Sequence, residues 1–377
     1  MIYDDVSDST RRTLSATARI LSTLKLDGPL LIGIALIAVY GQIVVYSASG
    51  GDLASLTRGT VRLTLGIVAM LTLAQVKPTV LRNLSPWLFG LGVILLVIVD
   101  AIGYIGKGAQ RWLDLGFVRF QPSEIMKLAV PMMCAWYLHE RALPPSGKSL
   151  LALAALVLIP VGLTIAQPDL GTGLLILIAG GLVIILAGLS PRIIALLAVA
   201  AVGAATIGWN YLHDYQQRRV LTFLDPSADP LGAGYHIIQS TIAIGSGGVF
   251  GKGWLKGSQA QLDFLPESST DFVYAVIGEE FGLVGILVLL CLYLFVVGRA
   301  LFLSMQTQDT FARLLSGSLA LTFFVYVFIN AGMVSGLLPV VGVPLPLVSY
   351  GGTSMVTLLA GFGILMSLYS HRKLVGS

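Results

Sequence analysis

Charged side chains are scarce in this chain. Only 11% of its 377 residues are Asp, Glu, Lys or Arg, whereas an ordinary soluble domain carries roughly 25%. Apolar residues make up 56% of the sequence, which excludes a water-soluble enzyme, a disordered protein and a nucleic-acid-binding protein. The net charge of +4 is too small an excess to indicate a polyanionic partner. The composition therefore predicts a polytopic membrane protein.

Cysteine and histidine are also scarce, and no nucleotide-binding motif is present. The two cysteines, Cys134 and Cys291, and the four scattered histidines follow no ligand spacing, which argues against a disulfide framework and a zinc site. The glycine-rich stretch near residue 250 fails the phosphate-loop pattern, because Ser246 stands where glycine is needed and Gly253 where Ser or Thr is needed. Energy from ATP is therefore not expected to enter through this chain.

Long apolar runs fill most of the sequence. A hydrocarbon core needs about 20 apolar residues per helix, and ten runs approach that length. They predict an all-α polytopic membrane protein with a single transmembrane domain at 29–370, between a polar arm at 1–28 and a tail at 371–377. The predicted spans are 29–49, 61–76, 86–104, 122–139, 150–167, 171–189, 191–212, 271–298, 311–334 and 351–370.

An even number of spans puts both chain ends on one side of the membrane. Lys and Arg are in modest excess on that side, so the positive-inside rule predicts that both termini are cytoplasmic. The connection at 213–270 then lies outside, and it is much longer than the others, as functional loops often are. Alternating apolar and polar residues from Tyr235 to Ile242 predict an interfacial helix within it.

Two ionisable residues of the fourth span would be costly in hydrocarbon unless they are paired or solvated. Glu124 and Lys127 stand three residues apart, on one face of a helix that Pro122 and Ser123 are suited to open. One interpretation is a structural ion pair that neutralises itself. The other is a pair that lines a polar cavity, which the nearby cation Arg111 favours.

Asp271 stands at the start of the eighth span, where an acidic residue is commonly a helix cap. Further acids crowd the same margin, and the cations of residues 107–127 could meet them there, so a site residue is the competing interpretation. Glu279 and Glu280 lie two turns deeper without a basic neighbour in sequence. We expect them to be structural, with a basic partner in another span or a bound proton.

Two polar, turn-rich segments share the predicted outer side with these ionisable residues. One is the short link at 167–172, and the other is the stretch at 339–354. As plain structure they are hairpin turns and the start of a helix. Their common location also makes them candidate walls of one extracytoplasmic cavity.

Six motifs run along the chain: GAQRWLDL at 108–115, FQPSEIMK at 120–127, QPDLGT at 167–172, FLPESSTDF at 264–272, EEFG at 279–282 and SYGGTS at 349–354. Together, and in this order, they resemble the SEDS (shape, elongation, division and sporulation) family over nearly the whole chain. The first motif is more similar to the members that elongate rod-shaped cells than to the division members. One departure is Ser269, which stands before Thr270 and Asp271 where many members have histidine, so no role of that histidine carries over.

The resemblance implies a peptidoglycan glycosyltransferase of the bacterial inner membrane, with its active site facing the periplasm. Such an enzyme polymerises lipid II by an inverting transfer that releases undecaprenyl pyrophosphate from the donor glycan. The implied partners are a class B penicillin-binding protein and other membrane proteins of the elongation complex, and no nucleic acid. A divalent cation, magnesium or manganese, is the one cofactor that the leaving pyrophosphate could need, and the sequence leaves its requirement open.

The resemblance also implies roles for individual residues. Asp271 matches the essential aspartate of the family and is expected to be the general base, in contact with Lys127 and Glu124. Together with Arg111, these residues form the expected catalytic set. The expected substrate-binding residues are Trp112, Gln121, Asp169, Lys252, Ser349, Tyr350, Gly351 and Thr353.

Two other functions stay open. A lipid II flippase could also use ten spans with buried charge, but it would need a charged path to both faces and repeated halves, and no internal repeat is evident. A non-catalytic scaffold of the elongation machinery would leave Asp271 dispensable.

Overall fold

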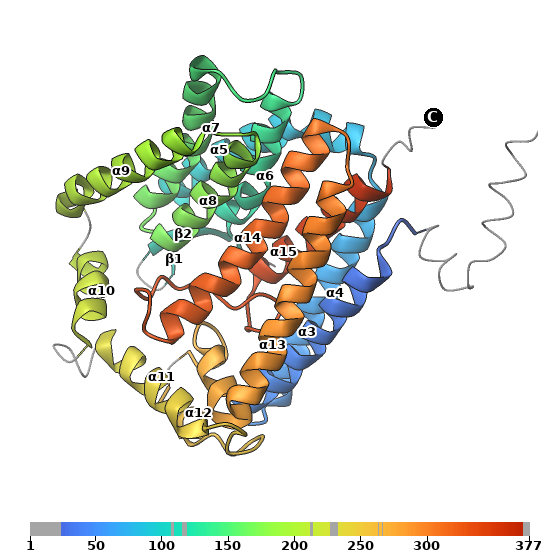
Figure 1. The fold of residues 1–377 in the computed structure, drawn as a ribbon. Helices are drawn as coiled ribbons and strands as arrows, with labels where there is room; N and C mark the ends of the chain where they lie inside the picture. The colour runs from blue at the N-terminus through green and yellow to red at the C-terminus, as the bar shows by residue number, and fades with distance from the viewer. Residues whose placement is uncertain are drawn as a thin grey trace, which may run out of the picture.

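The computed structural model describes residues 24–106, 109–114, 119–211, 214–226, 233–262, 264–265 and 267–371. In this part of the chain, antiparallel helices pack side by side into a bundle (Figure 1). Each of the ten predicted spans coincides with one helix. They are α3 (Gly28–Ala48), α4 (Leu53–Gln75), α5 (Pro78–Ile102), α6 (Pro122–Leu138), α7 (Gly147–Ala166), α8 (Leu170–Leu186), α9 (Pro191–Gly208), α13 (Val273–Met305), α14 (Thr310–Val334) and α15 (Thr353–Ser370).

The length and composition of these helices confirm an all-α polytopic membrane protein. Seven of the described helices, namely α3, α4, α5, α7, α13, α14 and α15, are long and apolar enough to cross a membrane. The apolar stretches of α8 and α9 are shorter, and α6 has 17 residues. Most of the predicted arm at 1–28 and of the predicted tail at 371–377 lies outside the described residues.

Two helix starts differ from the predicted spans. The α4 helix begins at Leu53 rather than near 61, because the carboxylate of Asp52 caps it by accepting the N–H groups of Ala54 and Ser55. The α5 helix begins at Pro78 rather than near 86. Polar residues in the first turns of both helices lower the local hydropathy, so the apolar runs underestimate the helix lengths.

The long connection between α9 and α13 is mostly helical. It contains η1 (Trp209–Tyr211), α10 (Asp214–Leu224), α11 (Ala233–Gly247) and α12 (Ser258–Gln261). The α11 helix confirms the helix predicted around 235–242. Its last residue, Gly247, packs directly on α13, since a Cβ atom there would lie 1.9 Å from the carbonyl oxygen of Gly278.

A small antiparallel sheet joins the end of α5 to the start of α6. Its strands are β1 (Tyr104–Gly106), β2 (Ala109–Asp114) and β3 (Arg119–Phe120), in the order β1-β2-β3. Tyr104 pairs with Trp112, and Leu113 pairs with Phe120. The sequence analysis treated this segment as a loop and did not foresee these strands.

The bundle has two distinct ends. We call one the sheet end: it holds the three strands, α11, α12 and the first turns of α6 and α13. We call the other the tail end: there Lys25, just before α3, and His371, just after α15, lie together with Nζ and Nε2 2.6 Å apart. The helices alternate in direction between these ends along the chain (Figure 1).

Candidate active site

A cavity of about 200 Å³ opens at the sheet end of the bundle. Its walls come from β2, the first turns of α6 and α8, and the segment 342–354 that leads into α15. The predicted site residues that line it are Arg111, Trp112, Gln121, Glu124, Lys127, Asp169, Gly351 and Thr353. The structure therefore brings the 167–172 link and the 339–354 segment to one cavity, as the sequence analysis expected.

The ion pair of Glu124 and Lys127 lies in the first two turns of α6. Pro122 opens this helix after the extended residue Gln121, which places the two side chains on one face. Lys127 Nζ lies 2.7 Å from Glu124 Oε1, and both side chains are nearly buried. Among the described residues, the second oxygen of Glu124 has no hydrogen-bond partner. The pair neutralises its own charge and also lines the cavity, so both interpretations of the sequence hold together.

Tyr326 of α14 contacts the same lysine. Lys127 Nζ lies 5.3 Å from the centre of the Tyr326 ring, within the range of a favourable cation–π contact. Tyr326 is almost completely buried. The ammonium group is therefore held by an acid from its own helix and by an aromatic ring from another.

Arg111 and Asp169 form a second polar group on the cavity wall. The guanidinium of Arg111 donates to the carbonyl oxygens of Gln167 and Pro168 and lies 3.8 Å from Asp169 Oδ1. Gln121 Nε2 donates to the other oxygen of this carboxylate at 2.8 Å. Asp169 also caps α8 by accepting the N–H of Thr172. Arg111 is thus fixed to the α7–α8 link, which leaves it a positioned rather than a mobile cation.

Asp271 lies at the edge of the same cavity. It precedes Phe272, the N-cap residue of α13, so it stands one position before the cap. Gly342 lines the cavity, and a Cβ atom on Gly342 would lie 3.5 Å from Asp271 Oδ2. The predicted contact between Asp271 and Lys127 stays a prediction.

The backbone around Asp271 is tied to the segment that forms the cavity wall. Buried Asn330 of α14 donates to the carbonyl oxygens of Asp271, at 2.9 Å, and Val343, at 2.7 Å. Ser349 Oγ donates to the carbonyl oxygen of Thr270 at 2.5 Å. These bonds fix the position of the aspartate relative to the cavity.

The sequence analysis missed Asn330 and Tyr326. Both lie in an apolar helix, and a side-chain amide at membrane depth has to be hydrogen-bonded. That cost is the signal that could have identified Asn330. Tyr326 gives no such signal, because a tyrosine in an apolar helix is ordinary packing.

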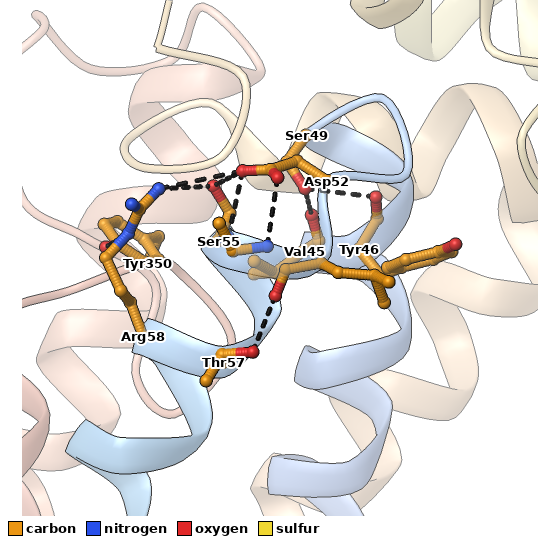
Figure 2. Close-up of polar contacts among 10 residues, drawn as sticks. Val45, Tyr46, Ser49, Asp52, Ser55, Thr57, Arg58 and Tyr350 are labelled. Carbon is orange, nitrogen blue, oxygen red and sulfur yellow. Dashed lines mark hydrogen bonds and ion pairs between the residues drawn. The ribbon is translucent and has the colours of Figure 1, made fainter.

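Tyr350 is engaged by α4 rather than by the cavity wall. Arg58 Nε donates to its hydroxyl at 3.1 Å, and the guanidinium of Arg62 lies 4.2 Å from its ring centre. Figure 2 shows Arg58 between this hydroxyl and the turn around Asp52 and Ser55, with Asp52 Oδ2 3.7 Å from the guanidinium. The hydrogen bond from the hydroxyl of Ser55 lowers the pKa of the Asp52 carboxyl most, and the hydrogen bonds from the backbone N–H groups of the α4 cap lower it further. Asp52 therefore stays ionised and holds Arg58 beside Tyr350.

Lys252 also has a partner outside the described cavity lining. Its Nζ lies 2.6 Å from Oε1 of buried Glu279, which also accepts from Ser258 and the N–H of Gln259. The basic partner of Glu279 therefore lies in the long connection and not in another span, which corrects the prediction. The proposed substrate contact of Lys252 is untested, and its ammonium group is already engaged.

The chain is similar to known proteins over most of its length. A family model described as cell cycle protein, and named for FtsW, RodA and SpoVE, matches residues 28–374. The chain belongs to this family. The FtsW/RodA/SpoVE family is the SEDS family that the six motifs resemble, so that prediction is confirmed.

Individual members of the FtsW/RodA/SpoVE family cover almost all of the chain. The peptidoglycan glycosyltransferase MrdB of Escherichia coli K12 is 53% identical over 351 residues, which are 93% of this chain and 95% of the relative. The protein of the same name from Helicobacter pylori 26695 is 38% identical and covers 78% of each chain.

Solved structures share the fold. A chain of a peptidoglycan synthase complex, in a study of how polymerization and crosslinking are coordinated, matches with a TM-score of 0.81 and 35% identity, over 92% of this chain and 98% of that one. The rod shape determining protein RodA of Thermus thermophilus matches with a TM-score of 0.70 and 30% identity, over 92% and 97%.

Proposed function

We propose that this chain is a peptidoglycan glycosyltransferase of cell elongation that polymerises lipid II into glycan strands. The observation that carries the proposal is the cavity at the sheet end, which combines an aspartate at its edge with two positioned cations, Lys127 and Arg111. A transfer between lipid-linked sugars requires a base at one end and positive charge for the leaving group at the other.

In the proposed reaction, the oxygen of the acceptor 4-hydroxyl attacks the anomeric carbon of the donor, and Asp271 takes the proton of that hydroxyl. The bond from that carbon to the pyrophosphate breaks, and undecaprenyl pyrophosphate leaves with the electron pair. A single displacement inverts the anomeric carbon. Lys127 and Arg111 meet the charge that develops on the pyrophosphate, where fixed donors stabilise the transition state most.

Glu124 stabilises Lys127 in its nearly buried position before substrate binds. An unpaired ammonium group there would be costly, and the carboxylate at 2.7 Å offsets this cost before substrate binds. Because Lys127 also lines the cavity, an arriving pyrophosphate can share its ammonium group with Glu124.

A magnesium or manganese ion, if the reaction needs one, would be bound mainly by the pyrophosphate of the substrate. Within the described residues, no three or more His, Cys, Asp and Glu side chains lie together as a metal-binding group. The pyrophosphate oxygens would have to supply most of the ligands. The roles proposed for Asp271, Lys127 and Arg111 therefore do not depend on a metal ion.

The proposed orientation places both termini in the cytoplasm and the cavity on the periplasmic side of the inner membrane. The excess of Lys and Arg that the sequence carries in the arm, the tail and the connections of the predicted cytoplasmic side supports it. A class B penicillin-binding protein is the proposed partner, together with other membrane proteins of the elongation complex. The similarity to a chain of a peptidoglycan synthase complex supports a partner that crosslinks the strands.

A flippase is the weaker candidate, because the interior below Lys127 is apolar. The α6 residues that follow it toward the tail end, such as Val130, Cys134 and Leu138, are completely buried among other apolar side chains. Among the described residues, a transported pyrophosphate that crossed this layer along α6 would meet mainly apolar side chains.

The decisive experiment is polymerisation of lipid II by the purified full chain, alone and with its transpeptidase partner. Asp271→Asn removes the basic oxygen with little change of shape, and we expect it to lower the rate by roughly a hundred- to ten-thousandfold. Asp263→Asn, at a position outside the described residues, should be mild by comparison. Near-normal polymerisation by a folded, lipid II-binding Asp271→Asn protein would refute the assignment and favour the scaffold.

A further inference from the structure

A second, larger cavity lies at the tail end of the bundle, remote from the proposed active site. Its volume is about 590 Å³, and it is bounded by the α4–α5 turn, the α13–α14 turn and the end of α15. The α5 and α14 helices connect the two ends with 25 residues each, or about 37 Å. This cavity therefore takes no part in the proposed transfer reaction.

The rim of this cavity is basic. Lys77 and Arg82, from the start of α5, line it, and within the described chain neither forms an ion pair or a hydrogen bond through its side chain. The acid in the lining, Asp309, already caps α14 by accepting the N–H of Ala312. Among the described residues, neither cation forms an ion pair with this carboxylate, so the lining carries two cations, Lys77 and Arg82, against the one acid Asp309.

His371 adds a third basic group, held in place by its neighbours. Its Nε2 lies 2.6 Å from Lys25 Nζ, and its Nδ1 lies 3.0 Å from the carbonyl oxygen of Ser367. An ammonium group can only donate, so Lys25 is the donor in this contact with His371. Lys25 thus carries its charge beside the cavity.

The floor of the cavity is apolar, and its rim lies where lipid-facing side chains begin. Phe311 and Leu368 line the floor and are buried. On α5, Val80 and Leu84 lie within two turns of Lys77 and are 51% and 47% exposed. Exposed apolar residues directly below exposed cations mark the headgroup level of a bilayer.

We propose that this tail-end cavity binds the phosphate headgroup of an anionic phospholipid from the adjoining leaflet. Lys77 and Arg82 meet the phosphate, Lys25 adds to the positive field, and the apolar floor takes the glycerol and the first carbons of the acyl chains. Basic pockets between transmembrane helices are suited to such headgroups. In the proposed orientation, the leaflet is the cytoplasmic one.

The test is thermal unfolding of the purified full chain in detergent with short-chain lipids. Dioctanoyl phosphatidylglycerol should raise the midpoint by about 2 °C or more, through binding to the folded state. Dioctanoyl phosphatidylcholine and inorganic phosphate should not. Equal protection by both lipids would overturn the proposal, and protection by inorganic phosphate without phosphatidylglycerol would make a free anion the ligand.

Two double variants are compared, and each removes two cations at the tail end of the bundle, one pair inside the cavity lining and one pair outside it. Lys77→Gln/Arg82→Gln should weaken the affinity for phosphatidylglycerol by roughly twenty-five-fold, at about fivefold for each cation. Lys148→Gln/Arg192→Gln, at exposed positions outside the cavity lining, should leave it unchanged. If both double variants lose affinity equally, the effect is diffuse surface charge and the site is refuted.

Two further full-length variants cover the remaining outcomes. Lys77→Arg/Arg82→Lys keeps both charges and should retain binding, which separates charge loss from misfolding. Asp4→Asn/Asp5→Asn/Asp8→Asn removes the acids of the N-terminal arm and should not alter the affinity. If phosphatidylglycerol bound only to this arm variant, the arm would be the occupant and the lipid proposal would fall.

Discussion

Lys127 illustrates how one residue can combine a structural and a catalytic role. Its buried ion pair with Glu124 is self-sufficient in the resting protein, yet the same ammonium group lines the cavity. Substitutions of this pair therefore change stability and activity together, and only a double variant separates them.

The first prediction concerns that pair. Lys127→Met leaves Glu124 buried without its partner and should destabilise the protein by roughly 3–5 kcal/mol. Adding Glu124→Gln removes the unpaired charge, so most of the thermal stability should return while lipid II polymerisation stays lost. Unfolding midpoints and polymerisation rates of the single and double variants measure this. A double variant that polymerises normally would exclude Lys127 from the chemistry.

The second prediction concerns Tyr350. Tyr350→Phe keeps the ring beneath Arg62 and loses only the hydroxyl that Arg58 contacts, so kcat/KM should stay within about threefold. Tyr350→Ala loses both contacts and should lower kcat/KM by about fivefold or more. Steady-state polymerisation with lipid II provides the values. Equal losses in the two variants would indicate that the hydroxyl itself contacts substrate.

The difference between local and distant pairs explains what the sequence could predict at this scale. Glu124 and Lys127 are three residues apart on a helix, so their pairing follows from helical geometry alone. Lys252 and Glu279 are 27 residues apart, and their contact depends on how the 247–257 turn packs against α13. The role predicted for Lys252 therefore missed its nearest partner, whereas the Glu124–Lys127 contact was predicted correctly.

At the level of elements, the α13 helix is interrupted by a fixed kink. Gly282 has a φ of 63°, a conformation that favours glycine. The 247–257 turn fits against this kink, with the N–H groups of Lys252 and Gly253 donating to the carbonyl oxygens of Glu279 and Glu280. The side chain of Glu280 also accepts from Ser47 of α3 at 2.6 Å. Kink and turn therefore stabilise each other.

The third prediction compares two glycines of α13. A Cβ atom on Gly282 would lie 2.4 Å from the backbone nitrogen of Gly251, so Gly282→Ala should destabilise the protein by roughly 1–3 kcal/mol and reduce polymerisation. Gly298 has open space around it, and Gly298→Ala should be neutral or stabilising by up to about 1 kcal/mol. Thermal unfolding of both variants measures the contrast. Equal midpoints would mean that the kink is not held by the turn.

The small sheet was not predicted, for a reason that lies in its length. Its strands have three, six and two residues, too few for alternation of apolar and polar residues to be recognised. The sheet matters nonetheless, because β2 carries Arg111 and Trp112 to the cavity wall. Motif resemblance identified these residues, and only the fold explains how they reach the site.

For the whole molecule, the apolar runs predicted the order of the long helices: each of the ten runs overlaps one helix, and seven of these helices are long and apolar enough to cross a membrane. Each span is a local property of the sequence, since about 20 apolar residues suffice to specify it. The arrangement of the long connection was predicted only as one helix. Its packing on α13 depends on close glycine contacts such as Gly247 with Gly278, which composition does not reveal.

The fourth prediction is the membrane topology. A periplasmic reporter, alkaline phosphatase, should be active when fused after residue 250, and a cytoplasmic fluorescent reporter should be active when fused after residue 371. The positive-inside bias is the physical reason. A cytoplasmic signal from the fusion at 250 would invert the bundle and place the active-site cavity on the wrong side for wall synthesis.

The length of α13 has a further consequence. After the kink at Gly282, residues 283–305 alone span about 35 Å, while the hydrocarbon layer is only about 30 Å thick. We therefore expect the part of α13 before Gly282 to lie outside the hydrocarbon layer. Asp271 would then lie at the level of the lipid headgroups, where the pyrophosphate of a membrane-anchored lipid also lies. The thickness of the bilayer then sets the distance, along the membrane normal, between Asp271 and the pyrophosphate of the substrate. In vesicles with acyl chains several carbons longer or shorter than native, we expect slower polymerisation with the fold intact, and an equal rate across thicknesses would contradict this.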